Sequence, residues 1–232
     1  MEFSPDQTII FQIGTVAINA TVFFTWIVMA LLTGVSMLVT RNLRPEVPPN
    51  RWRTTLEAVV QVIQGQIDDI SVRHDRRLLY FSGTLFLFIV VSNLLTVVPG
   101  FRSPTASLST TTALALSVFV AVPLFGIGSR GLGKYLKTYA QPSAIMLPFN
   151  ILGDFTRGIS LAIRLYGNIM SGAVIAAILL SIAPFFFPVL MDMLGLLTGL
   201  IQAYIFAILA TVYISSATSP APDASHTEKE ST

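Results

Sequence analysis

The stretch Ser160-Leu-Ala-Ile-Arg-Leu-Tyr-Gly-Asn168 decides the fold, because it sets one arginine, Arg164, at the start of a long apolar run. From 165 to 191 the sequence contains no Asp, Glu, Lys, Arg or His. A run of about 20 such residues can cross the hydrocarbon layer as a helix. An arginine at that depth costs about 3 kcal/mol on insertion scales and keeps its proton. We therefore interpret Arg164 as a functional charge; the alternative is a structural salt bridge with Asp154 or Asp192.

Composition supports a membrane protein along the whole chain. Of the 232 residues, 53% are hydrophobic and 11% are charged, whereas soluble domains carry about 25% charged residues. The mean hydropathy is +0.72. A net charge of +2 gives no reason to expect a nucleic-acid partner. Because there is no cysteine, a disulfide framework and a thiolate metal site are excluded. We expect neither a metal nor an organic cofactor.

The apolar segments predict an all-α integral membrane protein with five spanning helices, the last two of them long and tilted. The predicted spans are about 16–39, 78–98, 110–128, 142–181 and 189–217. Together with an amphipathic surface helix at about 50–72, they form a single membrane domain over residues 1–217. The glycine-rich segment 126–133 is interpreted as a loop that leaves the membrane, and 218–232 as a disordered tail.

The basic residues predict the orientation of these spans. Seven Lys and Arg residues lie between Arg41 and Arg77, and three more lie between Arg130 and Lys137. The connections on the opposite side contain only Arg102. Since basic residues are concentrated in cytoplasmic loops, we expect the N-terminus outside and the tail in the cytoplasm.

Two polar stripes follow from helical periodicity in the last two spans. One contains Gly153, Arg157, Ser160, Arg164, Asn168 and Ser171; the other contains Asp192, Gly195, Gly199, Gln202, Phe206 and Tyr213. For Asp192 the alternative is a carboxylate that stabilises a helix start. Asn168 and Gln202 could each be no more than an interhelical hydrogen-bond partner. The stripes thus leave a functional and a structural interpretation open for each of these residues.

Four motifs resemble those of one family. Ile151-Leu-Gly-Asp-Phe-Thr-Arg-Gly-Ile-Ser-Leu-Ala-Ile-Arg-Leu-Tyr-Gly-Asn168 is similar to the signature of subunit a of the rotary F-type ATP synthase. The block 200–217 resembles the last helix of that family. Asn93-Leu-Leu-Thr-Val-Val-Pro99 and Pro104-Thr-Ala-Ser-Leu-Ser-Thr-Thr111 resemble its middle motifs. The resemblance covers about residues 50–217.

The resemblance implies a stator subunit in the bacterial plasma (inner) membrane. Its partners would be a ring of c subunits, the b subunits of the peripheral stalk and the remainder of the complex. Arg164 would match the essential arginine, with Asn168 and Gln202 as its polar neighbours. Two aqueous half-channels would pass protons to and from a c-ring carboxylate, and the arginine would prevent a short circuit. The chain itself would perform no covalent chemistry.

Several positions depart from the family pattern. Ser107 replaces the usual Asp of the Pro-Thr-Ala-Asp motif, Gly153 and Ala173 replace glutamates, and Gly195 stands where His or an acid is common. The remaining half-channel candidates are Asp154, Arg157, Ser160, Asp192, Ser107 and Tyr213. Asp192 is either a relocated relay or unnecessary to a plain water path. The missing carboxylates keep sodium open as the coupling ion. A stand-alone secondary transporter or channel is the competing class.

Overall fold

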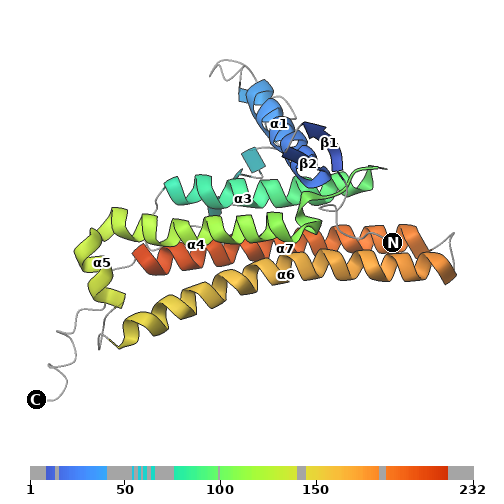
Figure 1. Cartoon of the computed structure of the whole chain (residues 1–232). Coiled ribbons are helices and arrows are strands. Elements are labelled where there is room, and N and C mark those ends of the chain that lie inside the picture. Colours follow the sequence, from blue (N-terminus) through green and yellow to red (C-terminus); the bar gives the residue numbers. More distant parts are fainter. Residues whose placement is uncertain are drawn as a thin grey trace, which may run out of the picture.

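A computed structural model of the chain describes residues 9–13, 16–40, a few separate residues between 54 and 65, 76–98, 100–139, 145–182 and 187–218. Its long elements are α1 (Ala20–Thr40), α3 (Arg76–Leu94), α4 (Leu108–Arg130), α6 (Met146–Ile182) and α7 (Phe187–Thr218) (Figure 1). All five are long and apolar enough to cross a membrane. The predicted class, an all-α membrane protein with five spans, is confirmed. The predicted surface helix at 50–72 lies mostly outside the described residues, as does the predicted tail.

The short elements were not predicted. Two strands, β1 (Ile9–Ile13) and β2 (Val16–Asn19), pair antiparallel before α1. The first helix therefore begins at Ala20 rather than near residue 16, because the runs IIFQI and VAIN are rich in β-branched and aromatic residues that favour strands. Two short 3₁₀ helices, η2 (Leu95–Val97) and η3 (Pro104–Ala106), connect α3 to α4.

The glycine-rich segment is a helical corner, so its interpretation as a loop was wrong. Helix α4 continues through Gly126 to Arg130, and α5 (Leu132–Tyr139) follows at once. Gly131 separates the two helices with a φ of 80°, a conformation that favours glycine. At Gly126 a Cβ atom would come within 2.8 Å of Cδ2 of the buried Tyr135. Gly131 thus ends α4 and turns the chain into α5, whereas Gly126 lies inside α4 and allows close packing.

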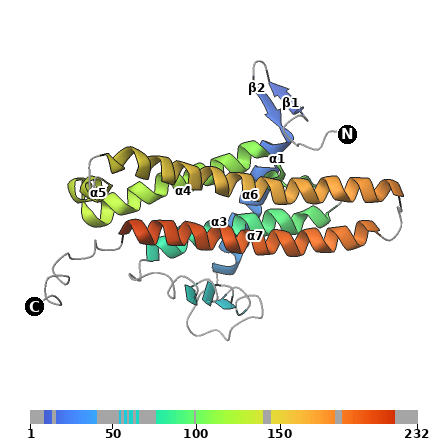
Figure 2. The ribbon, with the colours of Figure 1, turned by 90° about the horizontal axis from the view of Figure 1, so that it is seen from below.

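The core lies where α1, α3, α4, α6 and α7 meet. Its fully buried side chains include Val28, Ile89, Val118, Leu161, Leu165 and Phe206. Helix α3 packs most extensively on α7, and α4 on α6. Helices α6 and α7 lie side by side near the connection between them and diverge toward the start of α6, and α1 crosses the others at a steep angle (Figures 1 and 2). The 37 residues of α6 span about 55 Å, against a hydrocarbon layer of about 30 Å. Helix α6 is therefore too long to stand upright within that layer.

Candidate functional site

Arg164 lies near the middle of α6 and is exposed. Among the described residues it has no hydrogen bond and no ion pair. Its neighbours Leu161, Ala162 and Leu165 are buried, so the helix turns its arginine away from the core. A permanent charge that faces outward at the centre of a spanning helix needs a charged or polar partner, or water.

The alternative of an internal salt bridge is wrong for Arg164. Asp154 accepts a hydrogen bond from Arg157 instead, with 3.0 Å between Nη1 and Oδ1. Asp192 is exposed, and no ion pair with it occurs within the described ranges. Asp192 also lies beyond the first turn of α7, which begins at Phe187. Because the helix dipole acts within the first turn, the helix-start interpretation of Asp192 fails as well.

Asn168 connects α6 to α7. Its Nδ2 donates to the backbone oxygen of Thr198 across a distance of 3.3 Å. The two helices run antiparallel, as the colours of Figure 1 show. Arg164 lies four residues before Asn168, and Gln202 lies four residues after Thr198. The contact therefore brings Arg164 and Gln202 to the same level of the helix pair.

Gln202 is buried, whereas Arg164 is not. Its side chain is 6% exposed, and its Nε2 has no hydrogen-bond partner among the described residues. A buried amide nitrogen without an acceptor is uncommon in native proteins. The interpretation of Gln202 as an ordinary interhelical hydrogen-bond donor therefore finds no support, while that of Asn168 does.

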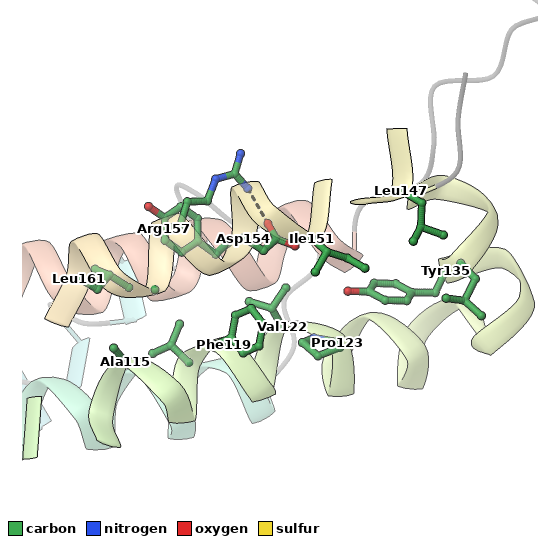
Figure 3. A pocket seen from close by; sticks show the side chains of 14 residues that line it. Ala115, Phe119, Val122, Pro123, Tyr135, Leu147, Ile151, Asp154, Arg157 and Leu161 are labelled. Carbon is green, nitrogen blue, oxygen red and sulfur yellow. Dashed lines mark hydrogen bonds and ion pairs between the residues drawn. The ribbon is translucent and has the colours of Figure 1, made fainter. Parts of the chain in front are cut away.

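A second polar group gathers where α4, α5, the start of α6 and the end of α7 meet. Asp154, Arg157 and Tyr213 line two adjoining pockets of about 190 and 240 Å³. Figure 3 shows the ion pair of Arg157 and Asp154 above the apolar wall of α4. The guanidinium carbon of Arg157 lies 5.5 Å from the ring centre of Tyr213. Arg130 lines the more polar pocket. Three of the six half-channel candidates thus come together here.

The other three candidates lie apart from this pocket. Ser160 is exposed on α6, four residues before Arg164, and Asp192 is exposed on α7. Ser107 is fully buried at the opposite end of α4. It caps that helix by accepting a hydrogen bond from the backbone N–H of Thr110 at 3.4 Å. Asp is also a favoured N-cap residue, so Ser107 can fill the capping role of the acid it replaces.

The sequence interpretation missed a buried chain of neutral polar groups. Thr105 and Ser103 share a hydrogen bond of 2.7 Å between their hydroxyl oxygens. Thr105 also donates to Oδ1 of Asn93 at 3.2 Å. Nδ2 of Asn93 in turn donates to the backbone oxygen of Gly199 at 3.0 Å. The available signal was a single asparagine in an apolar helix, since such residues in membranes typically bond to a neighbouring helix.

The fold and this site define a polytopic helical membrane protein with an arginine on its exposed face. The chain matches the family described as ATP synthase A chain over residues 22–215. It is 55% identical to ATP synthase subunit a 1 of Chlorobaculum parvum over 218 residues, covering 94% of this chain and 96% of that protein. It is 56% identical to ATP synthase subunit a 2 of Acaryochloris marina over 217 residues, covering 94% and 93%. For ATP synthase subunit a of Albidiferax ferrireducens the values are 54%, 94% and 94%.

The chain belongs to the subunit a family of the F-type ATP synthase. The resemblance drawn from the arginine and glutamine blocks is thereby confirmed.

Proposed function

We propose that this chain works in the stator of an F-type ATP synthase, where Arg164 separates two aqueous half-channels that lead to and from a ring of c subunits. The observation that carries the proposal is the outward-facing arginine, which has no hydrogen bond or ion pair among the described residues. A cation beside an incoming carboxylate favours its charged form and so drives off the bound ion. The same fixed charge repels a cation that would cross directly between the half-channels.

The cytoplasmic half-channel is assigned to the pocket of Asp154, Arg157 and Tyr213. Arg130, Lys134 and Lys137 lie at the same end of the bundle, in α4 and α5. Basic residues of that kind mark the cytoplasmic side, which puts the N-terminus outside and the C-terminus in the cytoplasm. Ser160 lies between this pocket and Arg164 along α6.

The outer half-channel is assigned to the opposite end, where Ser107 and the start of α7 lie. Asn168 lies between that end and Arg164, and Gln202 lies level with Arg164. Asp192 is the one titratable group between Arg164 and the end of α7 apart from tyrosines, which supports a role as relay. The absence of the family's usual half-channel carboxylates also supports sodium as the coupling ion. Proton coupling is proposed first and sodium coupling second.

The remaining partners follow from family membership. We assign the exposed face of α6 to the c ring, and we expect the b subunits of the peripheral stalk and the rest of the complex as further partners. The location is the bacterial plasma (inner) membrane. ATP is made or hydrolysed by other subunits, because this chain only conducts ions.

The test is Arg164→Ala in the assembled complex, with ATP-driven ion pumping into vesicles as the readout. We expect pumping to fall to background, because the ring carboxylate loses the nearby positive charge that drives off its bound ion. Arg76→Ala, which removes another exposed arginine at the start of α3, is the matched control and should pump normally. Unchanged pumping in Arg164→Ala would refute the proposal. Measuring the pumping of the Arg76→Ala complex with and without sodium identifies the coupling ion.

Purification distinguishes the proposed stator subunit from the competing class, a stand-alone secondary transporter or channel. A stand-alone transporter needs no ring, so this chain would be isolated alone in active form. A co-purifying ring of small hairpin subunits is the result that the proposal requires.

A further inference from the structure

Two side-chain amides from different helices bind neighbouring carbonyl groups of α7. Asn168 of α6 donates to the oxygen of Thr198 at 3.3 Å, and Asn93 of α3 donates to the oxygen of Gly199 at 3.0 Å. In an α-helix these carbonyls also accept from the N–H groups four residues later. A carbonyl oxygen has two lone pairs and can accept both bonds. Helix α7 is thus held at one point from two sides.

The contact of Asn93 requires glycine at position 199. A Cβ atom there would come within 2.8 Å of Nδ2 and 3.0 Å of Cγ of Asn93. Gly195, one turn earlier on the same helix, has open space at its Cβ position. Of the two glycines in the packing pattern Gly195-x-x-x-Gly199, only the second therefore makes a close contact that a side chain would break.

The side-chain oxygen of the Asn93 amide is also hydrogen-bonded. Its Oδ1 accepts from Thr105 at 3.2 Å, and Thr105 shares a hydrogen bond with Ser103 at 2.7 Å. All three side chains are at least nine-tenths buried, with Thr105 at 0% exposure. Because both ends of the amide are engaged, it can neither rotate nor follow α7 if that helix slides.

Axial sliding is the motion that apolar packing opposes least. Lipid tails are as apolar as the helices, so specific hydrogen bonds and close packing fix the position of one membrane helix along another. Gln202 lies one turn beyond Thr198, and its own Nε2 has no partner among the described residues. The position of Gln202 relative to Arg164 along the helix pair therefore depends on the axial position of α7.

We infer that Asn93 and Gly199 form a positioning lock, which together with Asn168 and Thr198 keeps Gln202 level with Arg164. Asn93 is a positioning residue and does not touch the transported ion. The lock fixes only the position of α7 along its neighbouring helices. Only its consequence for ion transport rests on the proposed function.

Disulfide cross-linking can measure the register directly, because the chain has no cysteine of its own. Gly172→Cys with Gly195→Cys reports the native register. These sites lie one turn past the contact of Asn168 with Thr198, and both have open space for a Cβ atom. Gly172→Cys with Met191→Cys reports a register shifted by about one turn. The measured quantity is the ratio of the two cross-linking rates in the assembled complex.

The lock is broken by Asn93→Leu, which keeps the volume and removes the amide. We expect the ratio to fall about fivefold, the effect of one interhelical hydrogen bond at the stronger end of the measured range. Gly199→Ala should act in the same direction. Thr105→Val leaves the amide in place and removes only its support, so it serves if Asn93→Leu does not assemble. For Thr105→Val we expect a fall of about twofold.

Ser82→Ala is the matched control. It removes a hydrogen bond of 2.9 Å to Thr211 between the same two helices, α3 and α7, but the Thr211 hydroxyl also lies 2.9 Å from the backbone oxygen of Ala207 in its own helix and can donate there instead. The ratio should stay unchanged in Ser82→Ala. An unchanged ratio in Asn93→Leu and Thr105→Val, or an equal fall in Ser82→Ala, would overturn the lock.

Ion pumping per assembled complex, measured without the cysteines, tests the consequence. We expect Asn93→Leu to lower it in parallel with the cross-linking ratio. A changed ratio with normal pumping supports the lock and refutes a role for Gln202 beside Arg164. Reduced pumping with an unchanged ratio overturns the lock and leaves the proposed function standing.

Discussion

Helices α3 and α6 are almost equally apolar, yet they differ in what surrounds them. Their most apolar windows have hydropathies of 2.0 and 1.9, but 44% of that window is buried in α3 and 6% in α6. The buried polar groups Ser82 and Asn93 of α3 bond to α7. By contrast, Ser160, Arg164 and Ser171 of α6 are exposed.

This difference separates two uses of polar residues in a membrane helix. In α3, Ser82 and Asn93 are satisfied within the chain, and Asn93 fixes α3 on α7 at Gly199. In α6 the central charge is exposed and has no hydrogen bond or ion pair among the described residues, as the proposed contact with a partner subunit requires. Hydropathy alone does not distinguish the two helices.

The largest expected contrast is between two isoleucines. Ile89 of α3 is fully buried and Ile163 of α6 is 59% exposed. We expect Ile89→Ala to destabilise the isolated chain by about 2–5 kcal/mol through lost packing, and Ile163→Ala by less than about 0.5 kcal/mol. Unfolding in mixed micelles measures both. Equal losses would break the comparison, because α6 would then be packed like α3.

A smaller contrast concerns hydroxyl groups. Thr211→Val removes the buried hydrogen bond to Ser82 and should cost about 0.5–1.5 kcal/mol of unfolding free energy. Ser160→Ala removes an exposed hydroxyl and should leave that free energy unchanged, while lowering ion pumping if Ser160 lines a half-channel. The same two assays measure these effects. A stability loss in Ser160→Ala larger than in Thr211→Val would contradict the assignment of α6 to transport.

A weak effect on stability is expected at the ion pair of Asp154 and Arg157. The Arg157 side chain is 57% exposed and that of Asp154 is 22% exposed. Water screens such a pair, so Asp154→Asn should change the unfolding free energy by less than about 1 kcal/mol. A change above about 2 kcal/mol would show that the pair belongs to the packed core rather than to a wet pocket.

Much of the fold followed from the sequence because long apolar runs have few possible structures in a membrane. The five spanning helices were accessible from apolar length. Helical periodicity put Arg164 and Asn168 on one stripe, with an interhelical contact of Asn168 as one of two open interpretations. Glycines were harder to interpret. Gly126 lies inside α4 with the ring of Tyr135 packed against it, and a tertiary contact of that kind leaves no local signal.

The lock at Asn93 was missed for the same reason. Its partner is a backbone carbonyl at Gly199, 106 residues away, and a backbone group carries no sequence signal. The helix-start alternative for Asp192 failed because the distance of Asp192 from the start of α7 depends on where that helix begins. Pairings between distant helices and the ends of helices are therefore the parts that required the structure.

The most direct measurement of the central claim is the passive ion leak of membrane vesicles that contain the assembled membrane sector with Arg164→Ala. If the arginine separates two half-channels, the variant should leak the coupling ion well above the level of the native and Arg76→Ala sectors, because the fixed charge that blocks the direct path is gone. A leak equal to that of the native sector, together with intact ATP-driven pumping, would contradict the account.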